Sequence, residues 1–457
     1  MERISKLMNE FYFHEKFGEV PLGWEVKSID KCFDFFPTAS FSRAVLTENG
    51  ECGYIHYGDI HTKFHRFLDL DKCKVPYVSS EMANRFTKLK EGDLIISDAS
   101  EDYEGVGKSV EVLNAKNKSI ISGLHTLHLR PKEGEFIIGF PGYLLNHNKV
   151  RLHILRSATG IKVYSVSKSA LKRVLLPKPP KPEQTAIVTI LSKVDEAIEA
   201  TQNSIKAAEK LKKAMMQNLL TGKLKPDGTW RTDDEFYVDE KFGKVPVGWE
   251  VARVKDYGFV QTGKTPPTAE SNVFSEIENE SRYPFITPGD LGESKFVSTS
   301  ERFVTEKGIR YSYKLPINSI CIVCIGSTIG KIGITKTEAC TNQQINALIA
   351  NENNSGEFFF YMMEYRKPHF KEIAGINATP QINKSGFNKY KLLRPKEKSE
   401  QEEIVSQLNS FDEENITKQS KIHTLQRLKK SLMQNLLTGK LRLDVEKVNK
   451  LLSEQAL

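Results

Sequence analysis

The 457-residue sequence has none of the features that mark membrane or exported proteins. It contains no run of about eighteen apolar residues, so no segment is a candidate membrane-spanning helix. The first residues, MERISKLMNEFYF, lack the apolar stretch of a signal peptide. Six cysteines are too sparse for a disulfide framework, and their spacing does not supply the four ligands of a zinc site. These absences predict a cytoplasmic protein with reduced cysteines and no membrane contact.

Catalytic motifs are also scarce. Gly258–Thr265 fits the phosphate-binding loop pattern GxxxxGK[ST] letter for letter. A working loop of this kind leaves an apolar strand and opens directly into a helix, whereas here Pro266 and Pro267 follow at once. The histidines show no pairing with a cysteine or with a serine nucleophile. We therefore expect no catalytic residue, no metal site and no cofactor, and an ATPase is the disfavoured alternative.

Two parts of the chain are copies of each other. Residues 15–26 (EKFGEVPLGWEV) return at 240–251 (EKFGKVPVGWEV), with ten of twelve letters identical. Residues 183–222 and 400–439 both open with Glu-Gln and end in Met-Gln-Asn-Leu-Leu-Thr-Gly. Copies this close predict two similar cassettes, each with a globular part followed by a long segment of its own.

The long segments have the periodicity of helices that pack along another helix. In the first segment, apolar or small residues alternate in steps of four and three at Ile187, Leu191, Val194, Ile198, Thr201, Ile205 and Ala208. In the second segment, apolar residues occupy corresponding places at Ile404, Leu408, Phe411, Ile422, Leu425 and Leu432. At ~1.5 Å per residue each helix is a rod of roughly 60 Å. We expect the two to pair antiparallel inside this chain, with a pseudo-twofold relation between the cassettes.

The globular parts repeat more faintly. Tyr54–Ile60 aligns with Phe285–Leu291, and Gly92–Ile96 aligns with Ser319–Val323. Short β-rich runs are broken by Gly and Asp turns, which predicts a mixed α/β or α+β fold for both. The runs are Leu94–Ser97, Val110–Leu113, Ser319–Ile325 and Lys331–Thr335, with a helical patch at Glu357–Lys367.

These boundaries predict seven segments. They are an N-terminal lead (1–14), a first globule (15–176), a first long helix (177–222), a linker (223–239), a second globule (240–393), a second long helix (394–441) and a C-terminal tail (442–457).

The formal net charge of +8 permits a polyanionic partner without identifying one. Polar residues at the turns after the β-rich runs are the side chains best placed to reach base edges or phosphates, although such residues are also common turn formers. The candidates are Ser100, Asp102, Tyr103, Lys108, His125 and Thr126 in the first globule and Ser327, Thr328, Lys331, Asn342, Gln343 and Gln344 in the second.

Several phrases of the chain resemble one protein family. Each long helix is entered through Glu-Gln (Pro182–Gln184 and Ser399–Gln401) and left through Gln-Asn-Leu-Leu-Thr-Gly-Lys-Leu. Four phrases of the second globule fit the same family: Thr262–Pro266, Pro284–Leu291, Gly326–Lys331 and Thr341–Gln344. The whole pattern resembles the specificity subunit of type I restriction-modification enzymes, over essentially the whole chain. The first globule departs from the family's sequence pattern, as expected if the two globules read different DNA sequences.

The resemblance implies a non-catalytic subunit that reads a split, asymmetric DNA site, one half with each globule. Contacts with the double-stranded DNA that the family resemblance implies are expected to come from the polar candidates at the turns of the two globules. Two methyltransferase subunits, which use S-adenosylmethionine, would dock on the conserved helices, and two ATP-dependent translocase-nuclease restriction subunits would complete the complex. The same role in a stand-alone methylation system without a nuclease is the nearest alternative. A purely structural coiled-coil scaffold fits less well, because it needs no paired globules of similar size.

The outward faces of the helices and their shared exits, Met216–Leu224 and Met433–Leu441, are the expected docking surface for those partners. Four lysines are expected to be exposed on these faces, so that their charge reversal would weaken assembly or DNA affinity without loss of folding: Lys212, Lys213, Lys429 and Lys430.

Overall fold

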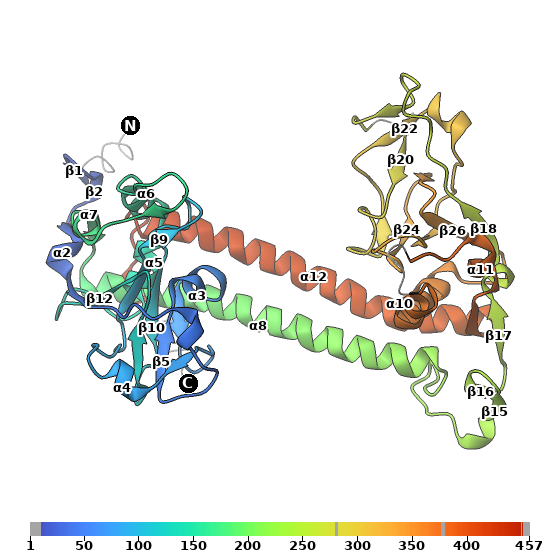
Figure 1. Cartoon of the computed structure of the whole chain (residues 1–457), viewed down its shortest axis with the longest axis horizontal. Coiled ribbons are helices and arrows are strands. Elements are labelled where there is room, and N and C mark those ends of the chain that lie inside the picture. Colours follow the sequence, from blue (N-terminus) through green and yellow to red (C-terminus); the bar gives the residue numbers. More distant parts are fainter. Residues whose placement is uncertain (1–10, 279–281, 376–379, 449, 451–457) are drawn as a thin grey trace. The chain divides into compact units, whose positions relative to one another are not determined.

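The computed structural model describes residues 11–278, 282–375, 380–448 and 450. The chain divides into two compact units (Figure 1): unit 1 comprises Met1–Thr201 and Lys421–Leu457, and unit 2 comprises Gln202–Ser420. Each unit contains an α+β globular part together with a portion of each of two long helices. Among the described helices, none has both the length and the apolar character needed to cross a membrane.

Unit 1 is built on a five-stranded sheet with the order β4-β12-β8-β10-β6 and a three-stranded sheet with the order β11-β5-β7. Its strands are β1 (Phe11–His14), β2 (Gly18–Pro21), β3 (Glu25–Ser28), β4 (Phe33–Phe36), β5 (Cys52–Ile55), β6 (Phe67–Asp69), β7 (Tyr77–Val78), β8 (Leu94–Ser97), β9 (Ala99–Ser100), β10 (Ser109–Leu113), β11 (Ile120–Ser122), β12 (Thr126–Pro131), β13 (Tyr164–Ser165) and β14 (Leu175–Lys178). Its shorter helices are α2 (Ile29–Cys32), η1 (Arg43–Val45), α3 (Tyr57–Thr62), α4 (Ser80–Ala83), α5 (Phe140–Leu145), α6 (Asn148–Leu155) and α7 (Lys168–Lys172).

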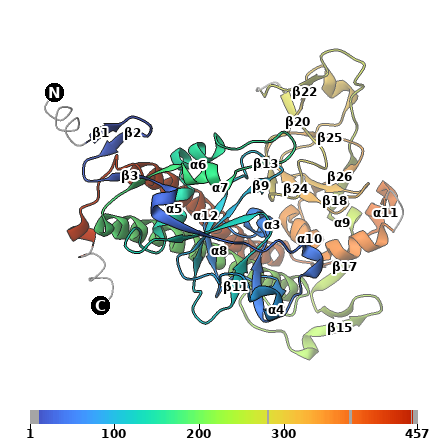
Figure 2. The same cartoon turned by 60° about the vertical axis from the view of Figure 1, so that its left-hand side comes forward.

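The two faces of the five-stranded sheet bury different partners, as the alternation of side chains along a strand requires. Leu94 and Ile96 of β8 point to a core shared with α5, α6 and the long helices. Ile95, between them, points to a second core that β8 and β10 share with β5 and β11 of the three-stranded sheet. Figure 2 turns unit 1 toward the viewer. The sheet is therefore a layer between the three-stranded sheet and the helices.

Unit 2 repeats this plan with a five-stranded sheet in the order β18-β26-β23-β24-β21 and a four-stranded group in the order β19-β22-β20-β25. Its strands are β15 (Phe236–Asp239), β16 (Gly243–Pro246), β17 (Trp249–Arg253), β18 (Gly258–Thr262), β19 (Phe274–Ser275), β20 (Arg282–Ile286), β21 (Phe296–Val297), β22 (Phe303–Thr305), β23 (Ile320–Val323), β24 (Ile332–Thr335), β25 (Cys340–Thr341), β26 (Ile345–Ala350) and β27 (Lys391–Pro395). Its shorter helices are η2 (Asp233–Glu235), α9 (Val254–Tyr257), η3 (Gly308–Tyr311), α10 (Gly356–Ile373) and α11 (Lys384–Lys389). The β-rich runs and the helical patch expected from the sequence are confirmed.

The strand registers define which residues of the two globules correspond. Leu94 pairs with Leu129 on one side, and Ile320 pairs with Leu348 on the equivalent side. Leu94 therefore corresponds to Ile320, whereas the alignment of Gly92–Ile96 on Ser319–Val323 is wrong by one residue. Strands buried on both faces lack the apolar-polar alternation that would reveal their register, and this accounts for the error.

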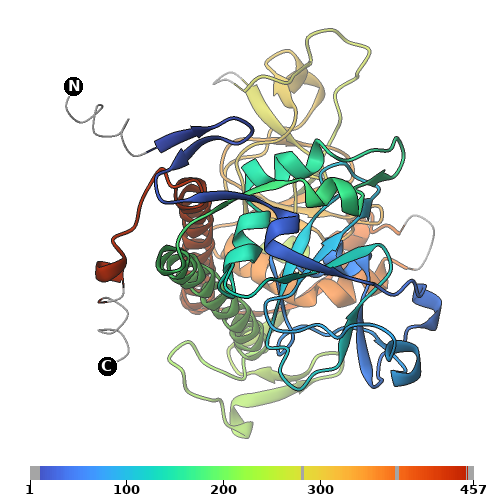
Figure 3. The same ribbon diagram turned by 90° about the vertical axis from the view of Figure 1, so that its left-hand side faces the viewer.

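The long helices are α8 (Lys181–Leu220) and α12 (Lys398–Leu436), 40 and 39 residues long. Pro182 lies in the first turn of α8, where its missing N–H is no loss. In unit 1 the start of α8 and the end of α12 share one core, which contains Leu191 and Met433. Figure 3 views these helices nearly end-on. In unit 2 the end of α8 and the start of α12 share another, which contains Leu219 and Ile404. Within each unit the two helices therefore run antiparallel.

Two of the four lysines expected on the outer faces of these helices lie elsewhere. Lys429 is only 5% exposed and forms an ion pair with Asp195 of α8 in unit 1. Lys212 has 20% of its side chain exposed and forms an ion pair with Asp412 of α12 in unit 2. Their expected exposure is wrong because each Nζ is turned to a carboxylate on the other helix. Lys213 and Lys430 are exposed.

Candidate nucleic-acid interface

Four loops of unit 2 meet at one edge of its five-stranded sheet. They follow β18, β20 and β23 and precede β26, and backbone hydrogen bonds join them. The Gly263 N–H donates to the Ile345 carbonyl at 3.0 Å, and the Cys324 N–H donates to the Gln344 carbonyl at 2.8 Å. This edge carries all six candidate residues of the second globule.

The side chains of residues 342–344 are held by short local hydrogen bonds. Asn342 Nδ2 donates to Gln344 Oε1 at 3.0 Å, and Asn342 Oδ1 accepts from the Gln344 N–H at 3.1 Å. Gln343 Oε1 accepts from the Thr265 hydroxyl at 2.7 Å, which ties the loop after β18 to the same place. Gln343 is exposed and presents an amide group, the type of group that pairs with an adenine edge.

The turn between β23 and β24 brings the remaining candidates to this edge. A Cβ at Gly326 would lie 3.5 Å from Gln344 Nε2, so the turn adjoins residues 342–344. Ser327 is exposed and Thr328 half-buried. Lys331 Nζ donates to the Pro288 carbonyl at 3.3 Å. The turn is thereby fastened to the loop after β20, and the lysine charge stays at this edge.

Unit 1 has the equivalent edge. The Asp98 N–H donates to the His125 carbonyl at 3.1 Å, in the place of the Cys324 and Gln344 pair of unit 2. Lys108, which corresponds to Lys331, donates to the His61 carbonyl at 3.1 Å. Burial lowers the pKa of Lys108, and the nearby Arg151 lowers it further.

The six candidates of unit 1 fall into two groups. Ser100 is 5% and Thr126 2% exposed, and their hydroxyls bond within the protein to the Asp102 N–H and the Gly123 carbonyl. These two side chains stabilise turns. The others reach the surface: Tyr103 is 43% exposed with its hydroxyl on the Leu155 carbonyl, and half of the His125 side chain is exposed. Asp102 is exposed and Lys108 half-buried.

Sequence reasoning missed an aromatic cluster on this edge of unit 1. The Tyr57 ring lies 4.6 Å from the ring of His56, 5.4 Å from that of His125 and 6.0 Å from that of His61, measured between centroids. Burial lowers the pKa of His56, and so does Arg43. His56 is the N-cap of the short helix α3, which contains Tyr57 and His61, whereas His125 comes from the distant turn before β12, so the sequence alone gave no sign that all three surround one tyrosine.

The phosphate-loop match has no phosphate-loop structure. Gly258–Thr262 is strand β18 itself, and residues 263–267 form a loop that does not lead into a helix. Lys264 is exposed, and its carbonyl accepts from Ser312 Oγ at 2.6 Å. Within the described residues, no group of three or more His, Cys, Asp or Glu side chains is placed to hold a metal ion.

A second duplicated site lies where each long helix ends. In unit 1, Gly439 follows α12 with φ +67°, and a Cβ there would lie 2.1 Å from Pro21 Cγ. In unit 2, Gly222 follows α8 with φ +67°, and a Cβ there would lie 2.2 Å from Pro246 Cγ. The two copied sequences, the EKFG motif and the helix exit, thus pack together in both units. We call these contacts the helix-end junctions.

A buried tryptophan and a carboxylate complete each junction. Trp24 Nε1 donates to Glu183 in unit 1, and Trp249 Nε1 donates to Glu400 in unit 2, both at 2.9 Å. An arginine also donates to each carboxylate, Arg442 to Glu183 and Arg231 to Glu400.

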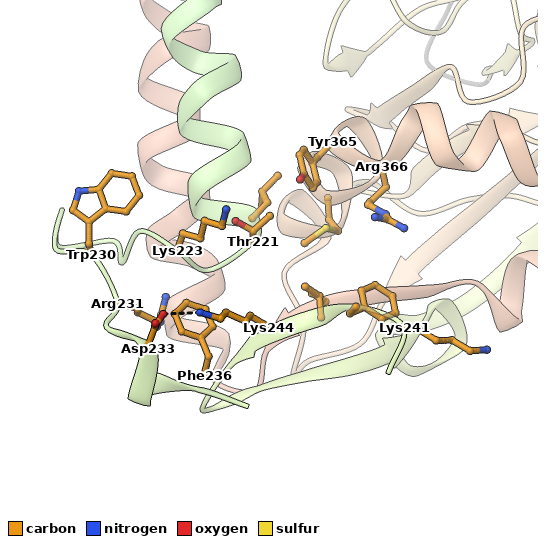
Figure 4. A pocket seen from close by; sticks show the side chains of 14 residues that line it. Thr221, Lys223, Trp230, Arg231, Asp233, Phe236, Lys241, Lys244, Tyr365 and Arg366 are labelled. Atoms are coloured by element: carbon orange, nitrogen blue, oxygen red, sulfur yellow. Dashed lines mark hydrogen bonds and ion pairs between the residues drawn. The ribbon is translucent and has the colours of Figure 1, made fainter. Parts of the chain in front are cut away.

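In unit 2 a cavity of about 600 Å³ opens beside the junction (Figure 4). Basic side chains outnumber acidic ones in its lining, which includes Lys223, Arg231, Lys241, Lys244 and Arg366 with Asp233.

Comparison with known proteins gives one consistent result. Residues 21–210 and 246–427 each match the family model described as the type I restriction modification DNA specificity domain. Two proteins of Methanocaldococcus jannaschii, assigned as the MjaX and MjaVIII type I restriction enzyme specificity subunits, are each 25% identical to this chain. The matches cover 95% of this chain and 99% and 98% of those proteins.

The fold is also similar to a solved structure, that of the type I restriction-modification system S subunit from M. genitalium. The TM-score is 0.53 at 16% identity, and the match covers 90% of this chain and 96% of that one.

Proposed function

This chain belongs to the family of type I restriction-modification specificity subunits, and from that premise we propose that it reads a split DNA site, with one globule on each half. The observation that carries the proposal is the duplicated loop edge, where the same strands of both globules present polar side chains. The two edges share their framework and differ in chemistry. Unit 1 presents Tyr57 and His125, and unit 2 presents Ser327 and Gln343.

Different side chains on one repeated framework are what an asymmetric site requires. Hydrogen bonds to base edges specify sequence, while contacts to phosphates position the protein. Lys108 and Lys331 occupy the same place in the two globules, so they suit the positioning role that any sequence needs. Gln343 and His125 differ between the globules, so they suit base reading. Each globule would supply one half-site, as repeated DNA-binding modules do.

The proposed arrangement of the whole chain is two globules held apart by α8 and α12 as an antiparallel pair with a pseudo-twofold relation. The pair would then fix the unread gap between the two half-sites. The proposed partners are two methyltransferase subunits, docked at the helix-end junctions, and restriction subunits where the complex cleaves DNA. The chain itself would be non-catalytic. The same role without a nuclease is the alternative, and no residue of this chain distinguishes the two.

Sequencing of modified bases tests the proposal. The chain is expressed with its methyltransferase subunit in cells that have no other modification system, and the methylated motif is read from the genome. We expect two specific half-sites separated by a gap of fixed length. Exchange of residues 27–176 for the matching globule of a relative should change one half-site only. A change in both halves would contradict the assignment of one globule to each half.

Point variants test the reading edge. Gln343→Ala and His125→Ala should each relax or abolish recognition of one half-site while the folded fraction stays constant. Thr126→Val is the matched control, because Thr126 is only 2% exposed and its hydroxyl donates to the Gly123 carbonyl. It should lower thermal stability without changing the methylated motif. If Thr126→Val changed the motif while Gln343→Ala and His125→Ala left it intact, the reading edge would be misplaced.

A further inference from the structure

Three residues connect the globular part of unit 1 to the two long helices and form what we call a tie. Asp195 of α8 and Lys429 of α12 form an ion pair across the two helices. The hydroxyl of Tyr143, on α5 of the globule, donates to the same Asp195 carboxylate at 2.8 Å. Lys429 Nζ also lies over the Tyr143 ring, 5.4 Å from its centroid. Each member of this tie comes from a different helix.

Unit 2 has the same tie with the roles of the long helices exchanged. Asp412 of α12 and Lys212 of α8 form the ion pair. The hydroxyl of Tyr361, on α10, donates to Asp412 at 2.6 Å, and Lys212 Nζ lies 5.1 Å from the centroid of its ring.

The repeat relates the two ties residue by residue. Asp412 and Lys429 lie as far along the second long segment as Asp195 and Lys212 lie along the first, an offset of 217 residues in both cases. The repeat therefore converts each ion pair into the other. An antiparallel pair slipped by one turn would place neither carboxylate opposite its lysine.

A partly buried ion pair adds little net stability to a helix seam. Desolvation offsets much of the attraction, and an apolar pair of similar volume is often at least as stable. A polar group at a seam position can instead specify register, because it finds its partner in one alignment only. Apolar seam positions specify the register less tightly, because one apolar side chain packs against another in several alignments.

We propose that the two Tyr-Asp-Lys ties select the single register in which α8 and α12 pair, and that they anchor each globule to the helices at that register. The ties are thus positioning residues. The consequence for the DNA gap rests on the function proposed above, whereas the register does not.

Cysteine cross-linking measures the register of the two helices in the full-length chain without any partner subunit. Counting from Asp195 and Lys429, Ile198 lies opposite position 426, so that Leu425 is one residue away from that position and Ile422 is four residues away, about one helical turn. A short thiol-to-thiol reagent should join an Ile198→Cys, Leu425→Cys pair and fail with an Ile198→Cys, Ile422→Cys pair. The wild-type chain, with its native cysteines only, is the control.

Apolar replacement of both ties is the deciding variant: Asp195→Leu, Lys212→Met, Asp412→Leu and Lys429→Met together. Net charge is unchanged. We expect helix content to persist while both cysteine pairs now cross-link, because slipped registers become populated. If only the Ile198 and Leu425 positions cross-link in this variant, the apolar seam sets the register and the proposal is overturned.

Charge exchange gives a second measurement that does not depend on how the apolar variant folds. Asp195→Lys with Lys212→Asp breaks both ties, as does Asp412→Lys with Lys429→Asp, and each double variant conserves net charge. Each should lower the thermal unfolding midpoint, and the four changes together should recover at least half of the loss. The control, Lys193→Glu with Glu196→Lys, exchanges an exposed pair on α8 and should have no effect. Absence of recovery in the fourfold variant would also overturn the proposal.

The gap length between the half-sites of the methylated motif then distinguishes a failure of this inference from a failure of the proposed function. If the cross-links shift as expected and the apolar variant methylates sites with more than one gap length, both hold. If the cross-links shift but no variant, nor the wild type, methylates a split site, the register lock stands and the DNA-reading function fails.

Discussion

The length of the helix pair can be changed without disturbing either tie. Residues 199–205 of α8 lie between Asp195 and Lys212, and residues 416–422 of α12 lie between Asp412 and Lys429. Four residues inserted in both places lengthen the rod by ~6 Å and turn it by only about 40°. DNA rises ~3.4 Å per base pair, so the unread gap should lengthen by one or two base pairs. Both half-sites should keep their letters.

Insertion into one helix alone is the matched control. One tie can then form only if the other is broken or the inserted residues bulge out. Breaking a buried pair costs about 3–5 kcal/mol, and the partial exposure of these carboxylates favours the lower end. We expect the single-helix variant to lose about 3 kcal/mol of stability in urea unfolding, whereas the two-helix variant should stay close to the wild type.

The assay is base-modification sequencing of cells that carry each variant with the methyltransferase subunit. An unchanged gap in a folded two-helix variant would refute the reasoning, because spacing would then be set by the globules or by partners. Altered half-site letters would refute it too, since the insertions are outside both globules.

Three further predictions follow from single sites. Gly439→Ala and Gly222→Ala should each destabilise their unit by more than the ~1–2 kcal/mol that a left-handed alanine costs, because the new Cβ would meet a proline ring. Gly228→Ala, at φ +87° with nothing within 4 Å, shows the backbone cost alone, and equal losses would contradict the packing argument. Burial, and less strongly Lys149, lowers the pKa of His147 from 6.5 to about 4. The unfolded chain binds this proton below about pH 6.5 and the folded chain only below about 4, so stability should fall as the pH drops through that window. A His147→Gln variant should show a shallower fall in unfolding midpoint, and parallel curves would exclude this histidine. Lys264→Ala should leave nucleotide binding at the background of the wild type, and an ATPase activity that this change abolishes would restore the phosphate-loop reading.

Periodicity carried most of what the sequence revealed about the fold. The seam of α8 and the β-rich runs are local patterns, and local patterns survive tertiary packing where a whole face is buried. The repeat added what periodicity cannot give, namely that two globules share one plan. The register of β8 against β23 was lost because Leu94–Ser97 and Ile320–Val323 are buried on both faces.

The candidate site was less visible for a physical reason. A polar side chain at a turn either forms a hydrogen bond inside the protein or faces the surface. Which of the two occurs depends on strands that are far away in the sequence. Thr126 turned inward to Gly123, whereas Gln343 stayed at the surface. Lys429 shows the same limit on a helix. Its partner Asp195 is 234 residues away, so no local pattern distinguishes it from the exposed Lys430.

The residues that are identical in the two copied sequences fall into a buried group and an exposed group, and packing explains only the buried one. Trp24 and Trp249 are buried against a carboxylate, and each exit glycine has no room for a side chain, so those letters are fixed by the junction itself. Other copied residues are exposed in both units: Glu15 and Glu240, Lys16 and Lys241, Gln217 and Gln434, Lys223 and Lys440. Stability places little demand on exposed side chains. Their identity, in globules that otherwise differ, is what one kind of partner would require if it docked at both junctions in the same way.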